Sequence, residues 1–172
     1  IRISYLKYTS SKADIYTLRP YAVKEFAKRW YIIGYCLERE ALRVYGLDRV
    51  HSLDILEERF EMEKGFDVDE LFATSFGIYL PEEAAKTITF RTSATEAKYL
   101  RDLPIHSSQV EVSSDGRTVT FSIFVCPNRN LIMEFCKYGD RLEVLSPESI
   151  RNQVASQLIS AAALYGGTRL PK

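Results

Sequence analysis

Arginine and tyrosine alternate in the segment ALRVYGLDRV, residues 41–50, and this pattern favours contact with an anion. Side chains of a β-strand point to opposite faces in turn, so Arg43, Tyr45 and Arg49 would share one face. A guanidinium group can bind phosphate oxygens or base edges through two parallel hydrogen bonds, and a phenol ring offers a surface on which a base can stack. The pattern therefore predicts a surface for a polyanion that carries flat bases.

The spacing of the two arginines sets a requirement on the ligand. Six residues of straight strand span roughly 20 Å, which exceeds the length of one mononucleotide. A straight strand through Arg43 and Arg49 thus predicts a single-stranded oligonucleotide, whereas a bulge at Gly46 would shorten the distance and admit a small nucleotide. The alternative is that Arg49 pairs with nearby acids and that Arg43 is a solvated strand residue.

Further residues of the same types lie in and before this segment. Aromatic rings could serve as stacking platforms, although rings in a small barrel often pack in its core instead. Trp30, which apolar residues flank, is expected in the core. The remaining candidates for ligand binding are Tyr31 and Tyr45 for stacking, Lys28 and Arg29 for a wider basic surface, and Tyr5 and Arg19 for its rim.

The elements that must position these residues are short strands in the first sixty residues. Residues 30–37 are apolar, 38–40 form a polar turn and 41–50 alternate, which predicts a β-hairpin. Residues 1–8 and 15–23 read as two earlier strands, with Pro20 at an edge or bend, and residues 52–60 could extend the sheet. Five short strands over residues 1–60 predict a small SH3-like or Sm-like barrel.

Helices alternate with strands in the second half of the chain, unlike in the first sixty residues. Residues 61–85 are expected to form a connector with one short helix that Asp67 caps and Gly77 ends. Over residues 86–172 the order is β-α-β-β-α-β, a ferredoxin-like domain, followed by one extra helix with Ser146 as its N-cap and Gly166 past its end. The predicted fold class is α+β, with a mostly β N-terminal part.

Charge is distributed unevenly although the chain has a net charge of zero. Residues 1–50 hold ten lysines and arginines against five acids, and the remainder holds thirteen against eighteen. A basic first third is the sign expected of a surface that meets phosphate, and the alternative is a chance asymmetry.

Several classes of function are disfavoured by composition. Three cysteines, Cys36, Cys126 and Cys136, have no metal-ligand spacing, and with only two histidines we expect neither a metal nor a cofactor. No nucleophile and base can be assembled, so we do not expect an enzyme. No signal peptide or membrane-length apolar run occurs, which favours the cytoplasm. The chain opens within a strand-like segment and without Met, so we expect that an upstream segment precedes it.

The sequence also resembles a known family in several ordered patches. RWYIIGYC followed by RVYGLDRV, after the approach RPYAVKEFAKRWY, resembles the WYL domain, with its naming triplet present as Trp30-Tyr31-Ile32. IHSSQ at 105–109 and KYGDRLEVLSPESIR at 137–151 resemble the extension that accompanies WYL domains. His106 and Gln109 match that extension's motif and are expected to be structural or, at best, ligand-gating.

The resemblance implies a bacterial transcriptional regulator in which a DNA-binding helical domain precedes an Sm-like WYL barrel and its extension. It further implies a homodimer that senses a nucleic acid or nucleotide, with Arg43 and Arg49 at family positions. No helix-turn-helix segment precedes Ile1 in this sequence. The expected function is therefore the effector-sensing and dimerisation portion of such a regulator. The rivals are a purely structural oligomerisation module without a ligand and a nucleotide hydrolase.

Overall fold

The structure of the protein, a computed structural model, describes residues 1–62 and 64–166. The chain divides into two compact units. The first comprises Ile1–Phe72 and Gly77–Leu80, and the second comprises Ala73–Phe76 and the described residues from Pro81 onward. Both contain an antiparallel sheet, and the α+β class with a mostly β N-terminal part is confirmed.

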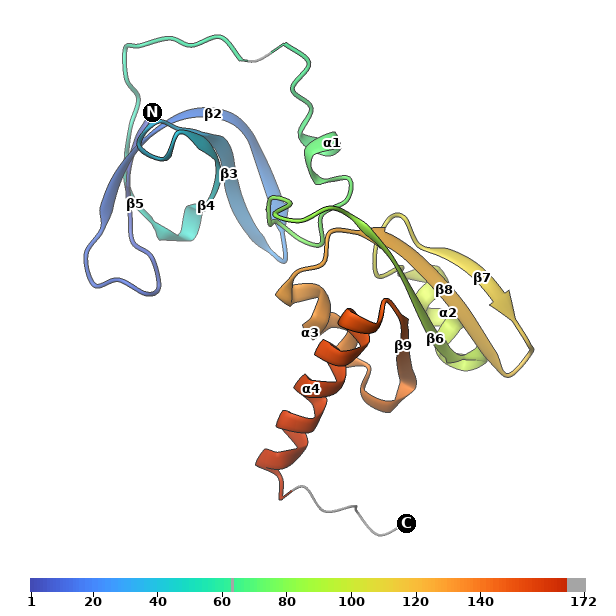
Figure 1. Cartoon of the computed structure of the whole chain (residues 1–172). Helices are drawn as coiled ribbons and strands as arrows, with labels where there is room; N and C mark the ends of the chain where they lie inside the picture. The colour runs from blue at the N-terminus through green and yellow to red at the C-terminus, as the bar shows by residue number, and fades with distance from the viewer. Residues whose placement is uncertain (63, 167–172) are drawn as a thin grey trace. The chain divides into compact units, whose positions relative to one another are not determined.

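The first unit is built on five strands, as predicted for the barrel (Figure 1). They follow one another in the sheet in the order β4-β3-β2-β1-β5. The hairpin is confirmed, but its second strand is shorter than expected because a 3₁₀ turn, Leu47–Arg49, follows Gly46. The strands are β1 (Arg2–Tyr5), β2 (Asp14–Phe26), β3 (Arg29–Cys36), β4 (Ala41–Gly46) and β5 (Val50–Asp54).

Strand β2 is long and bends, so its two parts pair with different neighbouring strands. Its first part pairs with β1 and its second part pairs with β3, and the register shifts between Pro20 and Ala22. Proline lacks the N–H that a regular ladder needs, which is why a bulge occurs there. The predicted bend at Pro20 is thus confirmed.

Strand β3 separates two apolar clusters of the first unit, because its successive side chains point to opposite faces. Ile32 lies in the inner cluster and Ile33 lies in an outer cluster with Phe72 and Ile78. Apolar residues of the connector pack in this outer cluster. The inner cluster consists of Ile3, Tyr5, Tyr16, Leu18, Ile32, Cys36 and Tyr45.

The connector contains helix α1 (Val68–Phe72), and its predicted cap is confirmed. The Asp67 carboxylate accepts hydrogen bonds from the backbone N–H groups of Asp69 and Glu70, at 2.7 and 3.2 Å. The helix ends at Phe72 and not at Gly77, because Phe72 is already buried in the outer cluster and the next residues join the second unit.

The second unit has the ferredoxin-like order of elements that the sequence predicts. Its strands are arranged β7-β8-β6-β9, all antiparallel, with the core between the sheet and the helices centred on Phe90, Phe121 and Phe135 (Figure 1). The elements are β6 (Lys86–Ser93), α2 (Ala94–Asp102), β7 (Val110–Ser114), β8 (Thr118–Val125), α3 (Arg129–Lys137), β9 (Leu142–Ser146) and α4 (Glu148–Leu164).

The extra C-terminal helix is present, but its start differs from the prediction. Ser146 does not cap α4, because it is still the last residue of β9. Its hydroxyl group forms a hydrogen bond with the Thr89 hydroxyl at 2.7 Å. Pro147 is the N-cap instead. Ile150 and Val154 attach the helix to the core, and Gly166, with a positive φ of 90°, follows its end as expected.

The β2–β3 turn carries backbone strain that one substitution should relieve. Ala27 and Lys28 both have positive φ, at 51° and 63°, although neither is glycine. That conformation costs a non-glycine residue roughly 1–2 kcal/mol, of which the extra chain entropy of glycine cancels part. We expect Lys28→Gly to raise the free energy of unfolding by about 0.5–1 kcal/mol. Trp30, the only tryptophan, reports this unit's urea transition by its fluorescence.

A matched control for this change is Lys12→Gly, in another exposed turn without positive φ. It should leave the free energy of unfolding unchanged or lower it slightly, because glycine there adds only unfolded-state entropy. Equal effects of the two substitutions would contradict the strain argument.

Candidate arginine–tyrosine site

Three tyrosines from three strands meet inside the barrel. The rings of Tyr5 and Tyr45 are 4.9 Å apart and nearly perpendicular, and those of Tyr16 and Tyr45 are 5.3 Å apart. All three are buried, and burial raises the pKa of Tyr5 and of Tyr45, which keeps these phenols neutral. Tyr45 therefore lies in the core and offers no free ring face to a base.

The Arg49 side chain packs against one side of this tyrosine core. Its guanidinium carbon lies 5.1 Å from the centre of the Tyr5 ring and 4.9 Å from that of Tyr8, so the group is held between two phenols. The 3₁₀ turn places it there, because the Arg49 carbonyl accepts a hydrogen bond from the Leu6 N–H at 3.0 Å. Its Nε is buried and has no hydrogen-bond partner, so this arginine retains an unused donor.

Arg29 and Asp48 join the same side of the core through Tyr8. Arg29 Nη1 donates to the Tyr8 hydroxyl at 3.0 Å, and this hydroxyl donates to Asp48 Oδ2 at 3.0 Å. The hydrogen bond that Arg29 donates to the Tyr8 hydroxyl raises the pKa of Arg29. Arg29 Nη1 also lies 3.3 Å from Asp48 Oδ2. Arg49 Nε lies 3.8 Å from the other oxygen, Asp48 Oδ1, so two guanidinium groups and one phenol surround a single carboxylate.

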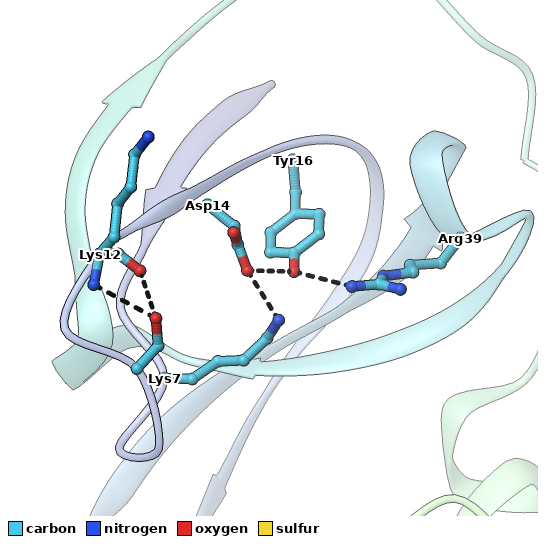
Figure 2. A network of polar contacts seen from close by, with 6 residues as sticks. Lys7, Lys12, Asp14, Tyr16 and Arg39 are labelled. Carbon is cyan, nitrogen blue, oxygen red and sulfur yellow. Dashed lines mark hydrogen bonds and ion pairs between the residues drawn. The ribbon is translucent and has the colours of Figure 1, made fainter.

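A similar arrangement surrounds Tyr16 on another side of the core, and Figure 2 shows it in close view. Arg39 Nη2 donates to the Tyr16 hydroxyl at 3.3 Å, and that hydroxyl donates to Asp14 at 3.0 Å. Lys7 binds the same carboxylate at 2.7 Å and thereby lowers the pKa of Asp14. Both cations also lie over the Tyr16 ring, at 5.5 and 5.7 Å.

Together these residues form one connected set, which we call the arginine–tyrosine cluster. Each guanidinium in it contacts a phenol. The rings of Tyr5, Tyr16 and Tyr45 contact one another in the core, and Arg49 joins Tyr8 to them. Its four cations outnumber its two carboxylates, so the set favours an anion. The cluster consists of Lys7, Arg29, Arg39, Arg49, Tyr5, Tyr8, Tyr16, Tyr45, Asp14 and Asp48.

Half of the predicted site residues lie in this cluster, namely Tyr5, Arg29, Tyr45 and Arg49. The others lie elsewhere on the first unit. Arg43 is exposed on β4 and bonds the Leu42 carbonyl at 3.0 Å, Arg19 is exposed beside the Tyr35 ring, Lys28 is exposed in the turn, and half-buried Tyr31 packs on the outer cluster.

Two sequence-based expectations about this region are wrong. The straight strand between Arg43 and Arg49 does not exist, because β4 ends at Gly46 and a 3₁₀ turn follows, so the alternative of an interruption at Gly46 describes this segment better. Trp30 is not in the core, since 55% of it is exposed. Strand β4 ends opposite Tyr31, so no neighbouring residue of β4 covers the indole of Trp30 from that side.

Sequence reasoning missed the other six members of the cluster, which are Lys7, Tyr8, Asp14, Tyr16, Arg39 and Asp48. The available signal was the density of lysine, arginine and tyrosine in residues 1–50. Two of the contacts that join the cluster are between distant residues: Tyr8 and Asp48 are forty residues apart, and Tyr16 and Arg39 are twenty-three apart. Spacing within one strand carries no information on such contacts.

His106 and Gln109 serve a structural purpose in the second unit. The Gln109 side chain accepts from the Ile105 N–H at 3.0 Å and donates to the Leu100 carbonyl at 2.7 Å, while His106 Nδ1 lies 2.7 Å from the Ser108 hydroxyl. Burial lowers the pKa of His106, which favours its neutral form. The motif therefore fixes the loop between α2 and β7.

Within residues 1–62 and 64–166, no three His, Cys, Asp or Glu side chains are grouped as a metal site would require. In the same ranges no helix is both long enough and apolar enough to cross a membrane.

Comparison with known proteins agrees with this division of the chain. The WYL domain matches residues 1–55 and the WCX domain matches residues 84–162. No curated protein matches. A structure described as a CRISPR Cas-related protein aligns over 96% of this chain and 47% of its own, with 15% identity and a TM-score of 0.59, and this likeness supports the fold.

Proteasome accessory factor B/C (PafBC) of Arthrobacter aurescens aligns over 99% of this chain and 26% of its own, with 20% identity and a TM-score of 0.41. The present chain thus spans less than half of either of these structures.

Proposed function

This chain belongs to the WYL-domain proteins in which a WCX domain follows, and from that membership we propose that it is the effector-sensing and dimerisation portion of a bacterial transcriptional regulator. The barrel binds single-stranded nucleic acid or a nucleotide, and the arginine–tyrosine cluster is the site. A DNA-binding domain of the same regulator responds to the ligand.

The observation that carries this proposal is Arg49. Its guanidinium is stacked between Tyr5 and Tyr8, which leaves its nitrogen edge as the surface that can donate hydrogen bonds. The buried Nε has no partner, and an unpaired buried donor costs free energy that an anionic ligand can recover. A phosphate, which accepts two parallel bonds from one guanidinium, suits this geometry.

Exposed basic residues outside the cluster suit a ligand longer than one nucleotide. Arg19, Lys28 and Arg43 are exposed on β2, the following turn and β4, where they can meet further phosphates. Phosphate contacts of this kind add affinity without sequence preference. The exposed Trp30 provides a ring on which a base can stack.

The direct test is a titration of the protein with a short fluorescein-labelled oligothymidylate at low and high salt. Saturable binding that weakens with salt is expected, because bound phosphates release counterions. Unlabelled mononucleotides and dinucleotides as competitors then establish the ligand length. If the labelled strand gives no saturable signal and no nucleotide shifts the barrel's unfolding transition, the sensing proposal fails.

The structural rival is examined with the same proteins by light scattering. A pure oligomerisation module requires that Arg43→Ala or Arg49→Ala abolishes the dimer while the wild type ignores nucleic acid. The sensing proposal instead requires that the variants keep the wild-type dimer and lose affinity for the strand.

A further inference from the structure

Asp48 occupies the place in the cluster where a ligand's phosphate would find its donors. Its Oδ2 accepts from the Tyr8 hydroxyl at 3.0 Å and faces Arg29 Nη1 at 3.3 Å, and its Oδ1 faces Arg49 Nε at 3.8 Å. The carboxylate is 36% exposed, so solvent and ligands can reach it. A phosphate oxygen bound by these groups would need the positions that the Asp48 oxygens now fill.

The Asp48 carboxylate lies farther from its arginines than the carboxylates of the second unit lie from theirs. The arginine–carboxylate bridges described in the second unit measure 2.6 and 2.9 Å from Glu143 to Arg91 and Arg151, 2.8 Å for Arg101 with Glu111 and 3.1 Å for Arg141 with Glu96. Charge-assisted bonds of this kind are typically about 2.7–2.9 Å long. Both of Asp48's arginine contacts, at 3.3 and 3.8 Å, are longer than any of these bridges, and Arg49 Nε remains without a hydrogen bond.

Asp14, in the equivalent arrangement around Tyr16, is held differently. Lys7 binds it at 2.7 Å and the Tyr16 hydroxyl adds a second bond at 3.0 Å. The hydrogen bond from Lys7 is the largest cause that lowers the pKa of Asp14, so the charged form is well matched. Asp14 is therefore a fixed part of the barrel, whereas Asp48 is a loosely held one.

We propose that Asp48 is an internal competitor for the ligand's phosphate, which it resembles in charge and which must displace it from Arg29, Tyr8 and Arg49. This inference rests on the proposed function, because it presumes that an anionic ligand binds the cluster. The Asp48 carboxylate is tied to the backbone next to Arg49, whereas a ligand's phosphate can orient freely, so its two non-bridging oxygens can accept from Arg29 and from the unused Arg49 Nε at the same time. The Asp48 carboxylate thus lowers the affinity of the cluster for every anion and prevents weakly charged anions from binding.

The test compares Asp48→Asn with Asp54→Asn in titrations of labelled oligothymidylate. An asparagine at position 48 can still accept from the Tyr8 hydroxyl, so the local fold is retained while the competing charge is lost. Asp54 is exposed at the end of β5, and its substitution changes the net charge equally. We expect about fivefold tighter binding for Asp48→Asn, the size of one partly exposed ion pair, and less than a twofold change for the control.

The outcomes separate this inference from the function on which it rests. If Asp48→Asn binds more weakly than the wild type, Asp48 positions the arginines, and the competitor idea is overturned while sensing stands. Equal gains in the two variants would mean a general charge effect and would also overturn it. Absence of binding by all three proteins overturns both proposals.

A second measurement observes the displacement itself. The Arg49 Nε–H resonance, assigned with an Arg49→Lys variant, should move when oligothymidylate is added to the wild-type protein, because the buried donor gains an acceptor. A resonance that stays in place while the strand binds would show that the phosphate sits elsewhere and would refute the competitor role.

Discussion

Replacing Arg49 with alanine should weaken the binding of labelled oligothymidylate about thirtyfold, the largest effect that we expect of any single change on ligand affinity. A hydrogen bond to a charged partner contributes about 1.5–3 kcal/mol, and each 1.4 kcal/mol is a factor of ten. The loss is this large because Tyr5 and Tyr8 hold the guanidinium in place before the ligand arrives.

The control for this variant is Arg59→Ala, which removes the same charge from an exposed loop of the same unit. It should lower the affinity by a small factor that disappears at high salt, because only long-range attraction is lost. Arg49→Lys should give an intermediate affinity, since lysine keeps the charge without the two-pronged geometry. Equal affinities of the Arg49→Ala and Arg59→Ala proteins would exclude Arg49 from the site, provided that Trp30 fluorescence shows a folded barrel.

The largest expected effect on stability belongs to Gly34→Ala. Gly34 lies in β3 opposite Pro20, where β2 bends, and a Cβ there would be 2.5 Å from the Arg19 carbonyl oxygen and 3.1 Å from the Pro20 Cα. Both neighbours are backbone atoms of a paired strand, so the two strands must separate. We expect the barrel's free energy of unfolding to fall by about 3 kcal/mol, the upper range for overpacking.

Urea unfolding followed by Trp30 fluorescence measures this loss. Gly65→Ala is the control, because a Cβ at Gly65 meets nothing within 4 Å and only its positive φ of 83° is unfavourable. It should cost about 1–2 kcal/mol. A Gly34→Ala protein as stable as the wild type would mean that the bend in β2 yields easily, contrary to the close strand contact described above.

The sequence predicts most of the elements because each has a local signal. Alternation marks β3 and β4, Asp67 marks the start of α1, and turn residues mark the ferredoxin-like order. These signals are local in origin, so they survive packing into the tertiary structure.

What the sequence does not predict depends on depth and on distant contacts. Trp30 and Ile32 share a face of β3, yet Ile32 is buried opposite Tyr45 while Trp30 extends past the end of β4. Alternation reports the face of a strand but not where its neighbour stops. The cluster likewise depends on Tyr8 meeting Asp48, a contact between residues forty positions apart that only the folded sheet produces.

The segment that joins the two units has a mechanical consequence. The Thr74 carbonyl accepts a hydrogen bond from the Cys126 N–H at 2.7 Å in the second unit, whereas Ile78 is buried in the outer cluster of the first unit. Only three residues separate these two anchor points. The chain therefore passes from the fold of the second unit into that of the first within these few residues, and any change in the distance between Thr74 and Ile78 is limited to what they can span.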